Sequence, residues 1–358
     1  MKVLYLTNIH NPYRDEFFEL LGLKCDLTVL FEERCDSARD GSWSENAHAR
    51  NYRELFLPEG DRGPISPVML NTIGGGWSLV VVGCYNSPKQ MMAIEYMRAR
   101  HMPYVVNLDG PLFSSKSSFK RRVRRHFLKG ANAYAVAGLT SVGSVRREVG
   151  KRAMVAPYPF SSIVESQLIE GGSDCQQRDN NLILCVGQFL PYKGIEVLLD
   201  AFADMASADN RLRIIGAGKR DDDLRNAVRK RGLSERVETV SFVTPLDLAS
   251  EYRRAGLLVL PSVQECWGLV INEAAANGCP VVSTWGSGAA IEFLSSDYPQ
   301  YLAEPGSAES LVLAIETFLA RPDEEKSAFS NFLRDKAAAY TIENMVSAHL
   351  ELFAEVLS

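Results

Sequence analysis

Two glutamates stand eight positions apart in Pro261–Gly288, a segment rich in glycine and small residues. A helix is expected to begin near Leu269, so that Glu265 lies in the preceding loop and Glu273 lies just over one turn inside the helix. Carboxylates in these two places can accept hydrogen bonds from sugar hydroxyls. The alternative is that Glu273 only complements the helix dipole and that Glu265 is a solvated loop residue.

The backbone between these glutamates could bind a phosphate. The amides of Gly268, Leu269 and Val270 lie at the expected start of the helix. Such amides have no partner within the helix and lie at the positive end of its dipole, and glycine allows close backbone approach. A phosphate seat with a carboxylate on each side has the shape of a nucleotide-sugar site, because sugar hydroxyls flank the diphosphate on both sides.

Two further turns follow predicted strands in the same half of the chain. In Cys185–Phe202 a strand runs into Gln188, then Lys193 and a helix. A lysine at such a turn can meet a phosphate as a point charge, although most exposed lysines are only solvated. In Ile214–Leu224, Gly216 belongs to a Gly-x-Gly that lacks the third glycine of a dinucleotide fingerprint. Neither turn alone identifies a ligand.

A polar loop follows the first predicted strand of the chain. It offers Asn8, Tyr13 and Arg14 at the end of a strand, where such groups can contact the hydroxyls or the phosphate of a second substrate. The alternative, of about equal weight, is a turn that only caps the next helix.

Short apolar runs rich in β-branched residues must position all of these groups. They are typical of strands buried on both faces, and segments with helical spacing such as Gly194–Met205 lie between them. The runs are Val3–Thr7, Leu27–Phe31, Leu79–Gly83, Tyr104–Asn107, Ala133–Ala137, Leu182–Val186, Leu212–Gly216, Val237–Phe242, Leu257–Leu260 and Val281–Ser283. The alternation predicts an α/β fold with two parallel sheets, whose ligands bind at the carboxyl ends of the strands.

The two series of strands predict two domains. The segment 159–180, with a Gly-Gly pair and many short polar residues, is expected to be a linker between an N-terminal domain at 1–158 and a C-terminal domain at 181–340. The last residues, 341–358, are expected to form a helix. The default ligand site of such a chain is a cleft between the domains.

Composition and charge exclude several classes of protein. The 358 residues are 46% hydrophobic and carry a net charge of −5, as is ordinary for a soluble chain of two domains. The seven cysteines are scattered without a Cys-x-x-Cys pair, which favours a reducing cytoplasm. The start lacks the apolar core of a signal peptide, and no stretch approaches the roughly 18 apolar residues that span a bilayer.

The charge is unevenly distributed. From Arg98 to Arg152 the chain holds 13 Lys and Arg against Asp109 and Glu148, a surplus of +11. Within this region Ser117–Lys129 predicts a basic amphipathic helix. One interpretation buries its apolar stripe against the domain's own sheet; the other attaches its basic face to anionic lipid headgroups. The residues that would meet the membrane are Lys120, Arg121, Arg122, Arg124, Arg125 and Lys129. No base-reading motif supports nucleic acid as a partner.

Several motifs occur in one order in the second half: VGQFLPYKG, IIGAGK, ECWGLVINEAAANGCPVV and PGSAESLVLAIETFL. Together they resemble the C-terminal half of the family 4 retaining glycosyltransferases, which have the GT-B fold. Glu265 and Glu273 match that family's Glu-x7-Glu signature, and the resemblance covers about Leu182–Leu319. It implies two Rossmann-like domains facing across a cleft, with the final helix returning to the N-terminal domain.

The resemblance also implies roles for individual residues of the donor site. Lys193 would bind the donor diphosphate and offset charge on the departing nucleotide. The amides of Gly268, Leu269 and Val270 would bind phosphate, and Glu273 would hold the ribose. Glu265 and the Cys266-Trp267 backbone would contact the transferred sugar. Such enzymes need no metal or other cofactor, because a lysine and a helix terminus stabilise the leaving group.

The sequence departs from the family in three places. Many members have arginine where this chain has Gln188, which leaves Lys193 as the chief cation at the phosphates. Members often have a histidine after the fourth strand of the first domain, where this chain has Asp109, and the sugar-orienting role of that histidine is therefore in doubt here. The glycine-rich first loop of the family is also replaced here, by the sequence NIHNPYRDEFF. The donor and the acceptor are therefore expected to contact this loop in a different way from other members.

The sequence thus predicts a metal-independent, retaining glycosyltransferase of the hexosyltransferase class that uses a UDP- or GDP-sugar and a glycan or lipid-linked hydroxyl acceptor. Its expected setting is polysaccharide or glycolipid assembly, in the cytoplasm or as a peripheral protein at the inner face of the cell membrane. The alternatives are a nucleotide-sugar epimerase or a phosphorylase of related build, and a non-catalytic nucleotide-sugar-binding protein. The alternatives differ in expected behaviour. An epimerase would convert the donor without an acceptor, a phosphorylase would need free phosphate, and a non-catalytic protein would bind the nucleotide without turnover.

Overall fold

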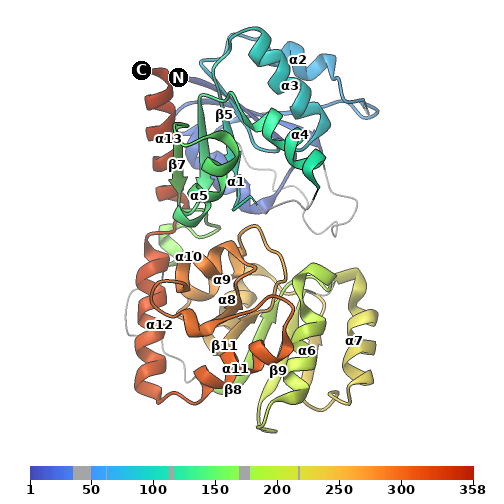
Figure 1. The fold of residues 1–358 in the computed structure, drawn as a ribbon. Helices are drawn as coiled ribbons and strands as arrows, with labels where there is room; N and C mark the ends of the chain where they lie inside the picture. The colour runs from blue at the N-terminus through green and yellow to red at the C-terminus, as the bar shows by residue number, and fades with distance from the viewer. Residues whose placement is uncertain (35–49, 62, 113–116, 169–177, 217) are drawn as a thin grey trace. The chain divides into compact units, whose positions relative to one another are not determined.

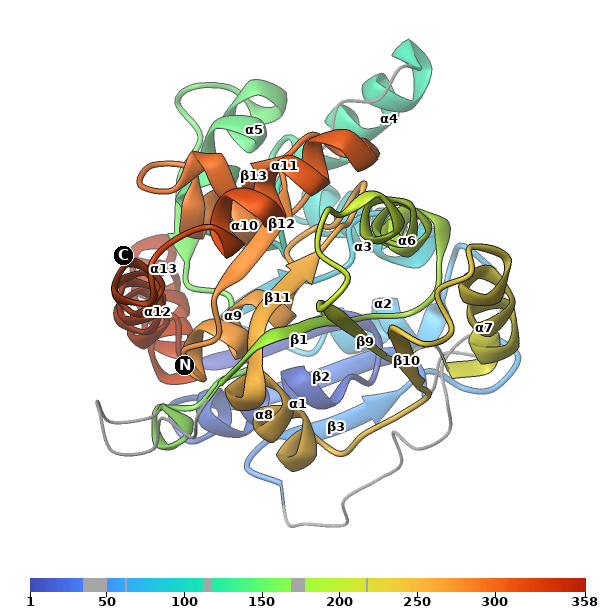
Figure 2. The ribbon, with the colours of Figure 1, turned by 90° about the horizontal axis from the view of Figure 1, so that it is seen from below.

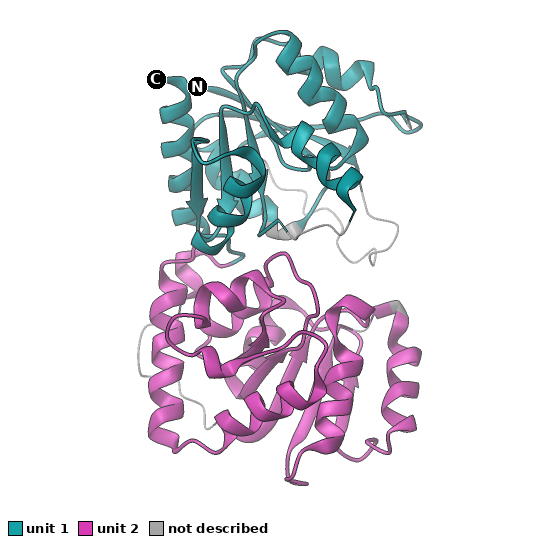
Figure 3. Ribbon diagram, in the orientation of Figure 1, with its two compact units in different colours: residues 1–162, 342–358 teal, residues 163–341 magenta. Residues whose placement is uncertain are grey.

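The computed structural model describes the chain except residues 35–49, 62, 113–116, 169–177 and 217. Both halves consist of strands that alternate with helices (Figure 1). The chain divides into two compact units, which are 1–162 with 342–358, and 163–341 (Figure 3). The last helix therefore belongs to the same unit as the first strand.

Unit 1 contains a seven-stranded sheet in the order β3-β2-β1-β4-β5-β6-β7, and all neighbouring strands are parallel. The strands are β1 (Lys2–Ile9), β2 (Asp26–Glu33), β3 (Arg53–Phe56), β4 (Leu79–Val82), β5 (Tyr104–Leu108), β6 (Ala133–Ala137) and β7 (Val155–Tyr158). The helices are α1 (Pro12–Gly22), α2 (Pro67–Ile73), α3 (Pro88–Ala99), α4 (Ser118–Leu128), α5 (Leu139–Val149) and α13 (Ile342–Leu357).

The strands of this sheet are apolar on both faces because helices cover both. Leu4 and Leu6 of β1 belong to the core on the face of α2 to α5. The alternate residue Tyr5 points to the other face, where its ring meets Phe17 of α1. Helix α13 packs on α1, β6 and β7 on this second face. Its buried stripe is Ile342, Met345, Val346, His349, Leu352 and Phe353.

Unit 2 contains a six-stranded parallel sheet in the order β10-β9-β8-β11-β12-β13, part of which is seen in Figure 2. The strands are β8 (Asp179–Val186), β9 (Arg211–Ile215), β10 (Val237–Val240), β11 (Ala255–Leu260), β12 (Val281–Thr284) and β13 (Leu302–Ala303). The helices are α6 (Ile195–Asp204), α7 (Asp221–Lys230), α8 (Pro245–Arg254), α9 (Leu269–Ala276), α10 (Gly288–Leu294), α11 (Ala308–Leu319) and α12 (Asp323–Ala338), with short 3-10 turns η1 (Glu165–Gln167), η2 (Pro191–Lys193), η3 (Gly218–Arg220) and η4 (Pro299–Tyr301).

The strand order of each sheet locates its ligand edge. The order reverses between β1 and β4 in unit 1 and between β8 and β11 in unit 2. In open parallel sheets, ligands bind outside the carboxyl ends of the strands at this reversal. The loops that follow β1, β4, β8 and β11 are therefore the places to look for chemistry.

Candidate functional site

Lys193 and Glu265 meet at the ligand edge of unit 2. Lys193 ends η2, which follows β8, and Glu265 lies in the loop after β11, the strand paired with β8. Their side chains form an ion pair between Nζ and Oε2 and are only 21% and 17% exposed. The sequence predicts both as site residues, and the structure brings them into contact. A cation and a carboxylate thus share one partly buried place, where salt screens their charges less than at an open surface.

The backbone holds Glu265 firmly. Its N–H donates to the carbonyl of Gly286 at 2.8 Å, and its carbonyl accepts from the N–H of Gly288 at 3.4 Å. Glu265 also forms a parallel bridge with Ser287. The loop after β11 is therefore anchored on the loop after β12.

Gly194 allows the loop that carries Lys193 to approach the end of β11. Its φ is +69°, and a Cβ at this position would lie 2.0 Å from the carbonyl oxygen of Pro261. The N–H of Val263 donates to the carbonyl of Tyr192 at 2.8 Å. Only glycine fits such a contact between two backbones, and this contact places Lys193 beside Glu265.

The N-terminus of α9 provides an anion seat next to this pair. Gly268, the N-cap of α9, has a φ of +103°, and a Cβ there would lie 2.9 Å from Ser287 Oγ. Gly268, Leu269 and Val270 are partly exposed. The first amides of a helix have no acceptor within it and lie at the positive end of its dipole. The three predicted phosphate-binding amides thus begin three residues after Glu265.

The neighbouring Trp267 is part of the core. Its side chain is 2% exposed. Its Nε1 donates to Asn272 Oδ1 at 3.0 Å, and its ring stacks on that of Tyr340 at 6.0 Å. Its carbonyl accepts from Ser287 Oγ at 2.7 Å and from the N–H of Ala289 at 2.9 Å. Cys266, next to it in the chain, is exposed.

Glu273 has a partner that the sequence does not reveal. The hydroxyl of Tyr252, on α8, donates to Glu273 Oε2 at 2.8 Å. Burial first, and then the charge of Glu273, raise the pKa of Tyr252 well above its usual value. The tyrosine therefore stays protonated and fixes one carboxylate oxygen of Glu273. A tyrosine on the buried side of an amphipathic helix is the only sequence signal for this contact.

The remaining donor-side candidates lie at the ends of neighbouring strands. Gln188 is exposed just beyond β8. Gly216, just beyond β9, has a φ of +102°, and a Cβ there would lie 3.4 Å from the carbonyl oxygen of Gly187. Asp221 and Asp223, in the first turn of α7, form ion pairs with Arg225 at 2.8 Å and with Arg220 at 3.1 Å. Asp221 is therefore paired within α7, and Asp223 is paired with an arginine of the preceding turn η3.

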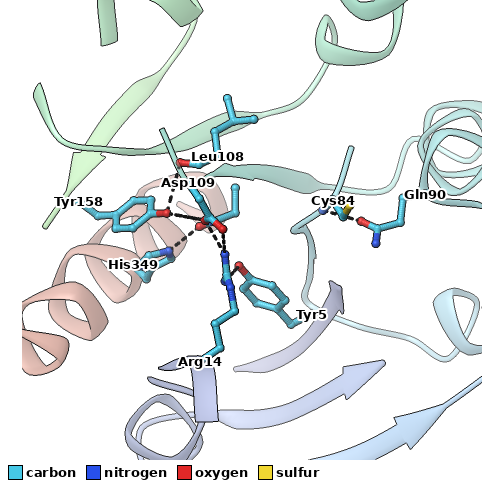
Figure 4. Close-up of polar contacts among 9 residues, drawn as sticks. Tyr5, Arg14, Cys84, Gln90, Leu108, Asp109, Tyr158 and His349 are labelled. Atoms are coloured by element: carbon cyan, nitrogen blue, oxygen red, sulfur yellow. Dashed lines mark hydrogen bonds and ion pairs between the residues drawn. The ribbon is translucent and has the colours of Figure 1, made fainter. Parts of the chain in front are cut away.

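Asp109 follows β5 at the ligand edge of unit 1 and contacts Arg14 of α1 (Figure 4). Arg14 Nη2 donates to both oxygens of the Asp109 carboxylate, and Arg14 Nη1 donates to Tyr5 Oη at 2.8 Å. Arg14 is 4% exposed and Asp109 is 31% exposed. Arg14 is thus committed to holding Asp109, and the carboxylate is the part of the pair that solvent reaches.

The other acceptor-side candidates have different positions. Asn8 is exposed near the end of β1. The side chain of Tyr13 lies outside the described residues. Arg14, by contrast, is in contact with a predicted catalytic residue, Asp109.

The basic helix α4 presents most of its charge to solvent. Lys120, Arg121, Arg122, Arg125 and Lys129 are exposed, and so is Phe119, at 73%. Arg124 instead pairs with Glu148 of α5 at 2.7 Å. Phe127 is partly buried against the core of unit 1. The apolar stripe of this helix, which is Phe119, Val123 and Phe127, is therefore divided: Phe119 lies in solvent and Phe127 lies on the protein. Across the described part of the chain, no helix combines the length and the apolar character needed to cross a bilayer.

Parts of the chain are similar to known glycosyltransferases. The family glycosyl transferases group 1 matches residues 176–335. An uncharacterized glycosyltransferase of Methanocaldococcus jannaschii is 28% identical over 178 residues, which are 49% of this chain and 45% of that protein. A D-inositol 3-phosphate glycosyltransferase of Corynebacterium aurimucosum is 32% identical over 146 residues, which are 38% of this chain and 34% of that protein. The chain thus spans less than half the length of these relatives.

A solved structure matches both units. HepE of Anabaena, in complex with UDP-glucose, superposes with a TM-score of 0.76 over 99% of this chain and 100% of that one, at 18% identity. This likeness extends over unit 1, which the family match at residues 176–335 does not reach. Residues 176–335 therefore belong to the glycosyl transferases group 1 family, and the two units have the Rossmann-like sheets of the GT-B fold.

Proposed function

We propose that the protein is a family 4 glycosyltransferase that moves a sugar from a nucleoside diphosphate-sugar to a hydroxyl acceptor, with retention at the anomeric carbon and without a metal. The observation that carries the proposal is the Lys193–Glu265 pair at the ligand edge of unit 2, immediately before the anion seat at α9. Retention is proposed from the family likeness.

The site can perform the donor half of this reaction. The amides of Gly268, Leu269 and Val270 would bind the diphosphate, and Lys193 would exchange part of its contact with Glu265 for a phosphate oxygen. Negative charge grows on the diphosphate as the bond to the sugar breaks, and a fixed cation and helix terminus stabilise that charge. Glu265 would then accept a hydroxyl of the transferred sugar.

Glu273 would bind the ribose. Tyr252 fixes one of its carboxylate oxygens, so that the carboxylate has a set orientation when a ribose hydroxyl donates to it. Preorganisation of this kind lowers the ordering cost of binding. HepE was solved with UDP-glucose, which makes a UDP-sugar the first donor to test for this chain.

The direct test is release of nucleoside diphosphate from UDP- and GDP-sugars with EDTA present, with and without hydroxyl acceptors. We expect turnover that depends on acceptor, survives EDTA and falls in Glu273→Ala through a higher donor KM. Turnover that EDTA abolishes would contradict the metal-independent site. Donor conversion without acceptor would favour an epimerase, a need for phosphate would favour a phosphorylase, and tight binding without turnover would favour a non-catalytic protein.

On the acceptor side, we propose that Asp109 receives a hydrogen bond from a substrate hydroxyl. Asn107 and Tyr158 donate to one oxygen of its carboxylate and Arg14 donates to both, and the side chain is 31% exposed. An oriented, partly exposed carboxylate at the ligand edge of unit 1 is suited to accept from a sugar hydroxyl. Asn8, exposed on the same edge, is a second candidate for the acceptor.

We also propose that α4 attaches the enzyme to an anionic membrane surface, where a lipid-linked acceptor for polysaccharide or glycolipid assembly would be found. The support is the exposed Phe119 next to the exposed Lys120, Arg121 and Arg122. Basic residues near an anionic bilayer contribute about 1 kcal/mol each, and an exposed aromatic ring suits the headgroup region.

Reversal of two charges on α4 should weaken membrane binding. For Arg121→Glu with Arg122→Glu we expect at least about a tenfold loss of co-sedimentation with vesicles of 30% phosphatidylserine in phosphatidylcholine. The matched control is Arg229→Glu with Lys230→Glu on α7 of unit 2, exposed residues that give the same change in net charge. An equal loss in both variants, or a wild type that ignores anionic vesicles, would refute the membrane surface on α4.

A further inference from the structure

A histidine of the last helix contacts a buried amide of the sheet in unit 1. His349 of α13 is 1% exposed, and so is Asn107 of β5. The two residues are 242 positions apart, and His349 Nε2 lies 2.8 Å from Asn107 Oδ1. His349 Nδ1 lies 2.7 Å from the carbonyl oxygen of Met345. The contact therefore links the end of the chain to the strand that carries Asp109.

Asn107 passes this contact on to the carboxylate. Its Nδ2 donates to Asp109 Oδ1 at 3.0 Å and to Tyr158 Oη at 3.1 Å. Asp109 Oδ1 also accepts from Tyr158 Oη at 3.0 Å and from Arg14 Nη2. Asp109 Oδ2 accepts from Arg14 Nη2 as its one contact in the described part of the chain. Among the described residues, three protein donors thus occupy Oδ1, whereas Oδ2 has one protein donor and keeps the capacity to accept from a substrate hydroxyl.

The orientation of the Asn107 amide decides whether this arrangement holds. With Nδ2 toward Asp109 the amide donates to the carboxylate, whereas the flipped amide would bring two acceptor oxygens together at about the same distance. An N–H on His349 Nε2 requires an acceptor at Asn107, and so selects the donating orientation. An amide oxygen turned against the buried side of the Asp109 carboxylate would be strongly unfavourable, which favours the donating orientation.

We propose that His349 is a positioning residue: through Asn107 it fixes the Asp109 carboxylate so that Oδ2 receives a substrate hydroxyl during sugar transfer. The role of Asp109 in this inference rests on the proposed function. The contact of His349 with Asn107 does not depend on it. Burial lowers the pKa of His349 to about 4, so that the ring is neutral near pH 7 and carries a single proton. The proposal assigns that proton to Nε2. The unprotonated Nδ1 then lies 2.7 Å from the Met345 carbonyl oxygen. This contact costs less than an Asn107 oxygen turned against the Asp109 carboxylate, because the carbonyl carries no net charge.

The assignment of the proton can be tested without activity. Correlation spectra of protein labelled with ¹⁵N at histidine should show the Nε2–H tautomer for His349 at pH 7, identified by loss of the signal in His349→Phe. Replacement of Asn107 by leucine should change this signal. The Nδ1–H tautomer in the wild type would overturn the proposal, whatever the enzyme's activity.

The role in transfer is tested with two variants of His349. His349→Phe keeps a ring against Phe17 and Tyr158, which lie 4.9 and 4.5 Å from the histidine centroid, and removes the donor. We expect kcat to fall about tenfold, with the donor KM within twofold of wild type, because the donor site lies in unit 2. His349→Gln can place an amide N–H near the position of Nε2, and we expect it to recover most of kcat.

A neighbouring core residue separates positioning from general damage. Phe353→Leu alters the same buried stripe of α13, and its ring contacts that of His349 at 6.0 Å. We expect it to lower the unfolding temperature and to leave kcat within twofold of wild type. The proposal is overturned if His349→Phe keeps the wild-type kcat, if Gln is as slow as Phe, or if Phe353→Leu loses as much kcat as His349→Phe. A wild type without any transfer would contradict the proposed function itself, and the tautomer would still report on the contact.

Discussion

Replacement of Lys193 by alanine is expected to lower kcat for sugar transfer by about 100- to 1,000-fold. Lys193 is the cation held beside Glu265 at the ligand edge of unit 2, and Gln188 supplies no charge at the neighbouring turn. The leaving diphosphate would therefore lose its main side-chain countercharge, while the α9 amides still bind it. Because the lost interaction strengthens as the bond breaks, kcat should fall more than the donor KM rises. Steady-state release of nucleoside diphosphate measures both.

Two controls separate catalysis from stability in this experiment. Lys326→Ala removes another partly buried lysine of unit 2, which pairs with Asp323 at 3.9 Å, and should leave kcat unchanged. Lys193→Ala with Glu265→Gln removes the unpaired carboxylate that the single variant leaves behind, and should recover thermal stability without recovering transfer. A Lys193→Ala enzyme with kcat within a few fold of wild type would remove Lys193 from the proposed mechanism.

The strands were largely predictable because of how they are buried. Each apolar run expected from the sequence coincides with an observed strand, from β1 to β12, since strands covered on both faces are apolar throughout. The sequence does not reveal β3, β7 or β13, all of them at sheet edges. β3 has two charged residues followed by two apolar ones, β7 contains Pro157, and β13 has two residues. Proline is tolerated in a strand at an edge, where no neighbour needs its missing N–H.

The members of the donor site were more predictable than their contacts. Lys193 and Glu265 each follow a strand and belong to recognisable motifs, but their contact depends on β8 lying next to β11 rather than next to β10. Strand order arises from the packing of the whole sheet, which local patterns do not encode. Trp267 shows the same limit, because its neighbours in the sequence give no sign that its ring packs on that of Tyr340, which lies between α12 and α13.

The polar network of unit 1 was the least predictable part. Arg14 and Asp109 are 95 residues apart, and each could equally be solvated at its own turn. His349 occupies a position of the apolar stripe of α13, where a histidine is most often only a core residue. A buried asparagine within a β-branched strand is the one local signal, because such an amide must find partners inside the fold. This signal indicates that the amide has hydrogen-bond partners, but it does not identify them.

Replacement of Gly194 by alanine is expected to have the largest effect on the structure of the donor site. The new Cβ would lie 2.0 Å from the carbonyl oxygen of Pro261, which is a backbone atom and cannot turn aside. The φ of +69° adds strain, since side chains other than that of glycine disfavour this region. We expect a loss of about 3–5 kcal/mol in stability, and a thermal midpoint lower by about 10 °C. Donor binding should fall as well, because the loop that carries Lys193 must move away from Glu265.

Gly232 offers a matched control for this substitution. Its φ is +68°, almost the same, but a Cβ there would have nothing within 4 Å. Gly232→Ala therefore carries the backbone strain without the clash, and should reduce stability by about 1 kcal/mol with donor affinity unchanged. Calorimetric unfolding and titration with a UDP-sugar measure the two effects. If the two variants behave alike, the loops after β8 and β11 do not need their close contact, and the placement of Lys193 beside Glu265 must have another cause.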